Sequence, residues 1–79
     1  MKERAKEMIE SIENHIKWAT EDLNEAVERF QAWAAKADAY SIATFGESEV
    51  RRVAEARKKL EKYYDEKEII EHLMRTEED

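Results

Sequence analysis

Apolar residues recur along the first half of the chain at alternating spacings of three and four. In seven-residue repeats lettered a to g, these residues occupy positions a and d. The a positions are Ile9, Ile16, Leu23, Phe30, Ala37 and Thr44, and the d positions are Ala5, Ile12, Ala19, Ala26, Trp33 and Tyr40. Only Thr44 is polar, and no part of this stretch shows the period of two that indicates a strand. The pattern predicts one long coiled-coil helix over about residues 3–43.

The pattern first breaks around Gly46, the only glycine in the chain. We predict that the chain reverses there, because glycine and a nearby capping residue mark helix ends. Two starts for the next helix stay open: Thr44 and Glu47 form a capping box, and Ser48 alone would cap a later start. A second helix is expected over about residues 46–64. Its apolar arc comprises Val50, Val53, Ala56, Leu60, Tyr63 and Tyr64.

The apolar face shifts after this arc. The last apolar residues lie about 130° farther around a helix that turns 100° per residue. They are Ile69, Ile70, Leu73 and Met74. Because Asp65 and Glu68 form another capping box, we predict a kink near Asp65 and a short helix over about 66–76. The alternative is one unbroken helix from whose seam Lys67 extends its amine, and residues 77–79 are expected to fray as an acidic tail.

Together these elements predict an all-α antiparallel helical hairpin. With a reversal near Gly46, the second arm would cover the first only as far as Ile16, and residues 1–14 would have no partner helix. Self-association into a helical bundle or coiled coil would cover them, so we expect a homo-oligomer, a dimer or higher. In outline this shape resembles the helical hairpins of small plasmid and phage regulators that dimerise into four-helix bundles. The resemblance is architectural and rests on no shared motif.

Length and composition restrict the class of protein. A chain of 79 residues is expected to form a single domain over 1–79. It has no cysteine for a disulfide or a thiolate zinc site. No apolar run approaches the ~18 residues of a membrane span, and the charged first residues lack the apolar segment of a secretory signal. We therefore expect a cytoplasmic protein that has no membrane partner.

The sequence carries no recognisable catalytic motif. One glycine cannot build a Gly-rich phosphate loop, and the Gly-x-Ser-x-Gly motif is absent. His15 and His72 are the only imidazoles, and neither lies three residues after a glutamate, the spacing found in di-metal helical bundles. We predict no catalytic residue, no metal and no cofactor, and therefore a protein that is not an enzyme.

Charge is distributed unevenly within the net value of −6. Residues 1–45 carry −3 and residues 65–79 carry −5, whereas residues 46–64 carry +2. A candidate basic face on the second helix comprises Arg51, Arg52, Lys58, Lys59 and Lys62. Such a face contacts phosphates in nucleic-acid-binding proteins, or it is simply solvated. Because the isoelectric point is about 5.0 and no nucleic-acid-binding motif is present, we place weak nucleic-acid binding last among the functions considered.

Two further charged features have a structural and a functional interpretation. Arg57 flanks the apolar arc, which predicts a buried ion pair with Asp38 or Glu28 on the first helix. A candidate acidic face comprises Glu21, Asp22, Glu25 and Glu28. This face either confers solubility or binds a protein that has a basic surface.

Trp18 lies outside the seam, at a c position among polar residues. An exposed tryptophan of this kind is typical of an interface anchor, although it could instead pack on the last helical piece. The candidate partner-binding residues are Trp18, Asn14, His15 and Asp22. The first expectation is a non-enzymatic protein–protein interaction module, a small regulator that acts as a helical homo-oligomer. The second is a small acidic inhibitor, of phage or mobile-element type, that occupies the basic nucleic-acid-binding groove of another protein.

Overall fold

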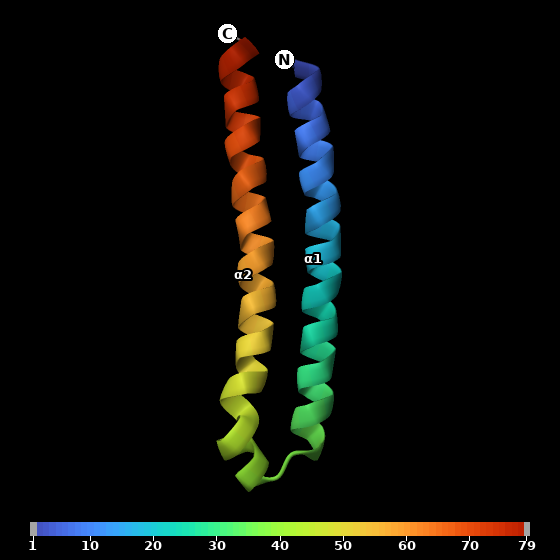
Figure 1. The fold of residues 1–79 in the computed structure, drawn as a ribbon, viewed down its shortest axis with the longest axis vertical. Coiled ribbons are helices and arrows are strands. Elements are labelled where there is room, and N and C mark those ends of the chain that lie inside the picture. The colour runs from blue at the N-terminus through green and yellow to red at the C-terminus, as the bar shows by residue number, and fades with distance from the viewer. Residues whose placement is uncertain (1, 79) are drawn as a thin grey trace.

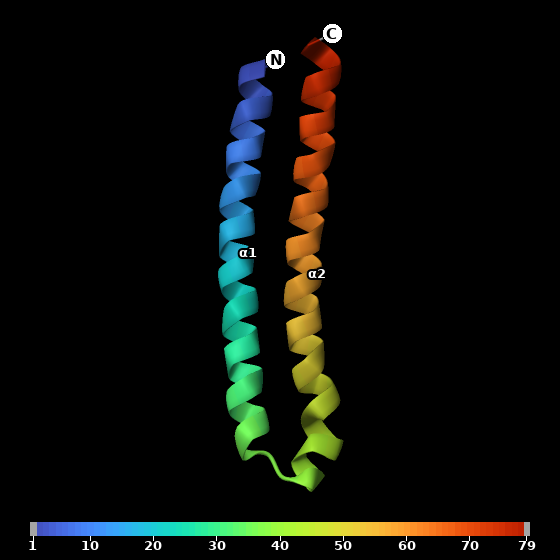
Figure 2. The same cartoon turned by 180° about the vertical axis from the view of Figure 1, so that it is seen from behind.

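The computed structural model describes the backbone of residues 2–78 and the side chains of residues 3–76. Over this range the chain forms two helices, α1 (Lys2–Lys36) and α2 (Ala39–Glu78), and no strand. The helices lie side by side and antiparallel, with both ends of the chain at one end of the rod (Figure 1, Figure 2). The Cα atoms span 60 × 16 × 11 Å. The prediction of an all-α hairpin is confirmed.

The chain reverses at residues 37–38, so the predicted reversal at Gly46 is wrong, as are the predicted helix bounds 3–43 and 46–64. Asp38 caps α2: its Oδ1 accepts a hydrogen bond of 2.8 Å from the backbone N–H of Ser41. The Asp38 carbonyl accepts a second bond of 3.0 Å from the N–H of Ile42. An aspartate cap satisfies one of the open N–H groups of a first helical turn, so this boundary needs no glycine.

Gly46 lies inside α2, eight residues beyond Asp38. It has no positive φ angle, so the backbone there does not require glycine. The residue is half-buried in the seam, and a Cβ atom built on it would lie 3.7 Å from Cγ2 of Ile42. Neither Thr44 nor Ser48 begins a helix.

The predicted kink near Asp65 and the separate helix over 66–76 are also wrong, because α2 is one helix. Its seam keeps the three–four spacing to the last described turns. The seam positions are Gly46, Glu49, Val53, Ala56, Leu60, Tyr63, Lys67, Ile70 and Met74. Lys67 belongs to the seam, as the unbroken-helix alternative requires, and Ile69 and Leu73 lie outside it. The helix α2 extends through Glu78, the predicted frayed tail over 77–79 stays a prediction, and Asp79 lies outside the described residues.

The predicted seam of α1 is confirmed from Ala5 to Trp33, where every a and d side chain is buried or half-buried. Ile12 and Ala19 are the most enclosed, at 8% and 3% exposure. With the early reversal, the arms have 35 and 40 residues and α2 covers α1 along its length. The predicted overhang at residues 1–14 is therefore absent from the described residues (Figure 1).

Candidate protein interaction site

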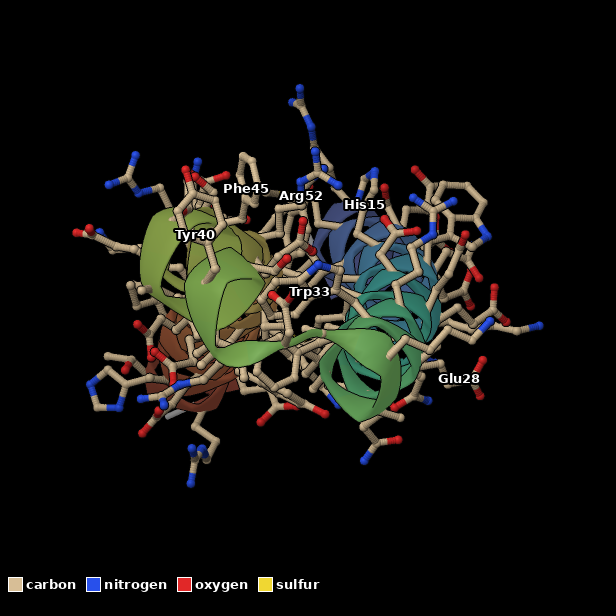
Figure 3. The ribbon with its side chains drawn as sticks, turned by 90° about the horizontal axis from the view of Figure 1, so that it is seen from below. His15, Glu28, Trp33, Tyr40, Phe45 and Arg52 are labelled. Carbon is tan, nitrogen blue, oxygen red and sulfur yellow. The ribbon has the colours of Figure 1, made fainter. Side chains whose placement is uncertain are left out.

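The hairpin presents one face on each side of the plane that contains both helices. Seven residues make nearly two helical turns, so every seventh residue stays on one face. The His15 face comprises Met8, His15, Asp22 and Arg29 on α1 and Phe45, Arg52, Lys59, Glu66 and Leu73 on α2, together with the adjoining rows that contain Ser11, Trp18 and Glu25 on α1 and Lys62 and Ile69 on α2. Two grooves join these rows, one lined by His15 and Glu66, the other by Asp22 and Arg52. Figure 3 shows His15, Phe45 and Arg52 on the same side of the helix pair.

The opposite side is the Tyr64 face. It comprises Glu13, Thr20 and Val27 on α1 and Val50, Arg57, Tyr64 and Glu71 on α2. The Nζ atom of Lys67 joins its two rows, because it lies 3.5 Å from Oε1 of Glu13 and 3.8 Å from Oε1 of Glu71. Lys67 occupies a seam position and its side chain is only 30% exposed. Its amine is nevertheless paired, because two carboxylates lie within ion-pair distance at the edge of the seam.

An aromatic cluster is centred on His15. Its ring stacks on Tyr63 of α2, with ring centroids 5.2 Å apart and planes 14° apart. Trp18 meets the His15 ring edge-on at 5.7 Å and 80° and is itself 58% exposed. Because residue 15 lies beside residue 63, Trp18 is level with about residue 60 of α2. Its contact with His15 replaces the predicted alternative, which was packing on the last turns of α2.

The other two candidate partner-binding residues, Asn14 and Asp22, are exposed. Asp22 lies on the His15 face, one helical turn beyond Trp18, whereas Asn14 belongs to the outer surface of α1. The structure thus places His15 and Trp18 in contact, with Asp22 farther along the same face and Asn14 on the outer surface.

Toward the chain termini, the His15 face contains an open apolar groove of about 460 Å³. It is lined by Met8, Ser11, Ile12, His15, Tyr63, Glu66, Ile69 and Ile70. Met8, Ile69 and Leu73 are exposed by 48%, 60% and 56%. Sequence reasoning did not include Met8 or Tyr63 among the site residues. The seven-residue spacing of Met8 and His15 was the available signal.

The charged faces predicted separately on the two helices lie beside each other. The acidic stripe is Glu21, Asp22, Glu25 and Glu28 on α1, and the basic stripe is Arg51, Arg52, Lys58, Lys59 and Lys62 on α2; all are exposed. Asp22, Glu25, Arg52, Lys59 and Lys62 lie on the His15 face, and the other four lie on the outer surfaces of the two helices. Asp22, Glu25 and Arg52 line one groove of about 230 Å³. Between the described residues no ion pair joins the two stripes: Arg51 pairs with Glu47, and Glu25 with Arg29, each within its own helix.

The predicted buried ion pair of Arg57 is wrong. The Arg57 side chain is 72% exposed, and its Nε donates to Oε1 of Glu61 at 2.9 Å on the same helix. Neither predicted partner is available, because Asp38 caps α2 at the turn and Glu28 points outward from α1 (Figure 3). Both partners were predicted from a hairpin whose turn was placed at Gly46, whereas the chain reverses at residues 37–38.

Three further observations concern metal binding, membrane spans and similarity to known proteins. Among the described residues no group of three or more His, Cys, Asp or Glu side chains could hold a metal ion. Within the same range neither helix is long and apolar enough to cross a membrane. Comparison with known proteins finds no family model, no curated protein and no solved structure that matches this chain.

Proposed function

We propose that this chain is a non-enzymatic protein–protein interaction module that acts as a helical homo-oligomer. The observation that carries the proposal is the accessible surface of the single chain. The hairpin exposes 6647 Å². A compact monomer of 9.4 kDa exposes about 5000 Å². An excess of this size is surface that a second molecule can cover.

The packing of the hairpin explains the excess. Two helices enclose their shared seam only where they touch, so the most buried side chains are Ile12 and Ala19 and no large side chain in the described range is fully buried. Nine large apolar side chains in that range are exposed by about half or more. Four-helix bundles enclose such seams on all sides, and two hairpins supply the four helices.

A partner whose surface carries charge of only one sign fits this hairpin less well. An inhibitor that occupies a basic groove needs an extended acidic surface, and a nucleic-acid-binding protein needs an extended basic one. Here the acidic stripe and the basic stripe lie at the same level of the rod, where Asp22, Glu25 and Arg52 share a groove. A uniformly charged partner would meet attraction and repulsion together.

Sedimentation equilibrium on a concentration series up to about 200 µM tests the proposal, because association follows mass action. We expect a species of at least twice the 9.4 kDa chain mass. Tryptophan emission of a Trp33→Phe variant, in which Trp18 is the only indole, should shift to shorter wavelength as the species forms. A single-chain mass throughout, with long-wavelength Trp18 emission, would contradict the proposal.

A further inference from the structure

We propose that the His15 face packs against the same face of a second copy, about a two-fold axis parallel to the helices, with both turns at the same end. In this arrangement α1 of each copy lies on α2 of the other. The inference rests on the proposed function, since it specifies how the homo-oligomer is built.

The distribution of exposed apolar side chains selects the face. Of the nine large ones in the described range, five lie on the His15 face and two, Val50 and Tyr64, lie on the Tyr64 face. The five are Met8, Trp18, Phe45, Ile69 and Leu73. Met8, Ile69 and Leu73 lie in the half of the rod that contains the chain termini, at the apolar groove or within a turn of it, and Trp18 lies at the middle of the rod. Association through the opposite face would leave this groove in water.

The area of the face suits a second copy. A rectangle of 60 by 16 Å has an area of roughly 1000 Å², and specific interfaces bury about 800 Å² per partner. The rod is only 11 Å deep between Cα atoms, so its broad faces are far larger than its edges. Two such rods in face-to-face contact form a compact four-helix bundle.

The charges select the orientation. With both turns at the same end, Asp22 and Glu25 of one copy lie on Arg52 and Lys59 of the other, twice, because these residues occupy the same level of the rod. With the turns at opposite ends, α1 would lie on α1 and α2 on α2. Lys59 would then lie opposite Lys59 at the middle of the rod, and the two Asp22 residues would lie about 9 Å apart along its axis, whereas Arg52 would come level with Glu66.

The apolar groove favours the same orientation. With the turns together, the Met8 end of one copy meets the Ile69 and Leu73 end of the other, so both apolar ends are covered. Trp18 then lies over the aliphatic stems of Lys59 and Lys62 of the second copy, where an indole suits both the stems and the ammonium groups. With the turns apart, each apolar end would meet the charged turn half of the other copy.

Paired charge reversals test the face. The acidic-stripe variant is Asp22→Lys with Glu25→Lys, and the basic-stripe variant is Arg52→Glu with Lys59→Glu. Each should weaken self-association at least tenfold, and an equimolar mixture should recover association to near the wild-type level, because opposite charges then face each other again. Circular dichroism of each variant alone establishes that the hairpin still forms, and the mixture tests the contact even where one variant is destabilised.

The matched control is Glu10→Lys with Glu68→Lys. These exposed acids lie on the outer surface toward the Tyr64 face, and the change in net charge equals that of the acidic-stripe variant. We expect self-association to change less than threefold. A control that weakens association as much as the stripe variants, or stripe variants that associate like wild type, would overturn the choice of face while the homo-oligomer stands.

A spin label tests the orientation. The chain has no native cysteine, so Ala35→Cys carries a single nitroxide on the outer surface beside the turn. With the turns together, the two labels of a dimer should lie within about 35 Å, and with the turns apart they should lie about 50 Å apart, since residue 35 is 16 residues from the middle of the rod at 1.5 Å per residue. The longer distance would overturn the orientation, and a monomeric sample would overturn the proposed function itself.

Discussion

The two faces of the hairpin use equivalent positions of one seven-residue repeat, yet they place their charges differently. On the Tyr64 face, Lys67 of α2 binds Glu13 of α1 as well as Glu71, so an ion pair joins the two helices there. On the His15 face, the acidic and basic stripes lie beside each other with no ion pair between them in the described range. That face also carries most of the exposed large apolar side chains.

The difference shows how a small helical hairpin can direct its association. An ion pair that joins the two helices leaves little electrostatic gain for a partner, whereas stripes of opposite sign with no ion pair between them leave a self-complementary pattern. Apolar area supplies most of the free energy of association, and the charges select among orientations. A hairpin in which both faces had the apolar content of the His15 face would continue to add copies in layers.

The largest difference between the two faces is expected when one exposed apolar residue on each face is replaced by lysine in separate variants. Ile69→Lys, on the His15 face, should raise the dissociation constant of the homo-oligomer about a hundredfold, because it puts an unpaired charge into the apolar end of the interface. Val50→Lys, on the Tyr64 face, is the matched variant and should change it less than threefold. Both side chains are already exposed in the single chain, by 60% and 53%, so neither change should unfold it.

Sedimentation equilibrium of the two variants, in parallel with wild type, gives the comparison. Equal weakening by both changes would mean that the two faces contribute alike. A larger effect of Val50→Lys would assign association to the Tyr64 face.

Lys67→Met should raise the stability of the hairpin against unfolding without altering self-association. Methionine completes the apolar seam, and Glu13 and Glu71, exposed by 54% and 45%, remain hydrated when their partner is lost. We expect the free energy of unfolding to rise by about 1 kcal/mol, since apolar replacement of a partly buried ion pair is often stabilising. Urea unfolding at one protein concentration measures it, with Arg57→Met as the control at an exposed pair. A loss of stability would mean that the ion pairs outweigh the apolar gain.

Gly46→Ala changes a seam position that belongs to neither face. The helix interior has no need for glycine here, and the added methyl would sit in ordinary contact with Ile42 at 3.7 Å. The free energy of unfolding should rise by about 0.5–1 kcal/mol because alanine has the higher helix propensity. Thermal unfolding followed by circular dichroism checks the sign, which would be reversed if Gly46 formed the turn.

The smallest effect concerns the cap of α2. The backbone N–H and the side chain of Ser41 hydrogen-bond to the Asp38 carboxylate and hold its pKa below the ordinary value of 3.8. A lowered pKa stabilises the fold above the ordinary value, and the contribution disappears as the pH falls through the lowered one. Asp38→Ala should therefore lower the melting temperature by roughly 3 °C at neutral pH, and the difference should shrink as the pH falls through the lowered pKa. A difference that is independent of pH would exclude the carboxylate as its origin.

Much of this fold was predictable from periodicity, and its main error has a physical cause. The three–four spacing continues from Trp33 through Ala37 to Tyr40, across the turn, although Tyr40 is 75% exposed. A pattern of side chains cannot reveal a reversal that it happens to span. The true signal was Asp38, a strong capping residue, which lies between two alanines that favour helix.

The position of the turn also limited how much of the candidate site could be predicted. Trp18, His15 and both charged stripes were identifiable as exposed groups on single helices. That the stripes share a level, and that His15 stacks on Tyr63, depends on where α1 and α2 lie along each other. A reversal placed eight residues late shifts this register by about two turns on each arm, so contacts between helices could not be derived.

The two-residue connection also determines how the hairpin is expected to fold. Seam contacts form a nested series, in which those near Trp33 close short loops and those near His15 and Tyr63 close a loop of 48 residues. Because loop-closure entropy grows with loop length, pairing should begin beside Asp38 and proceed toward the termini like a zipper. Substitutions near Phe30 and Trp33 should then slow folding, whereas those near Ile12 should mainly accelerate unfolding.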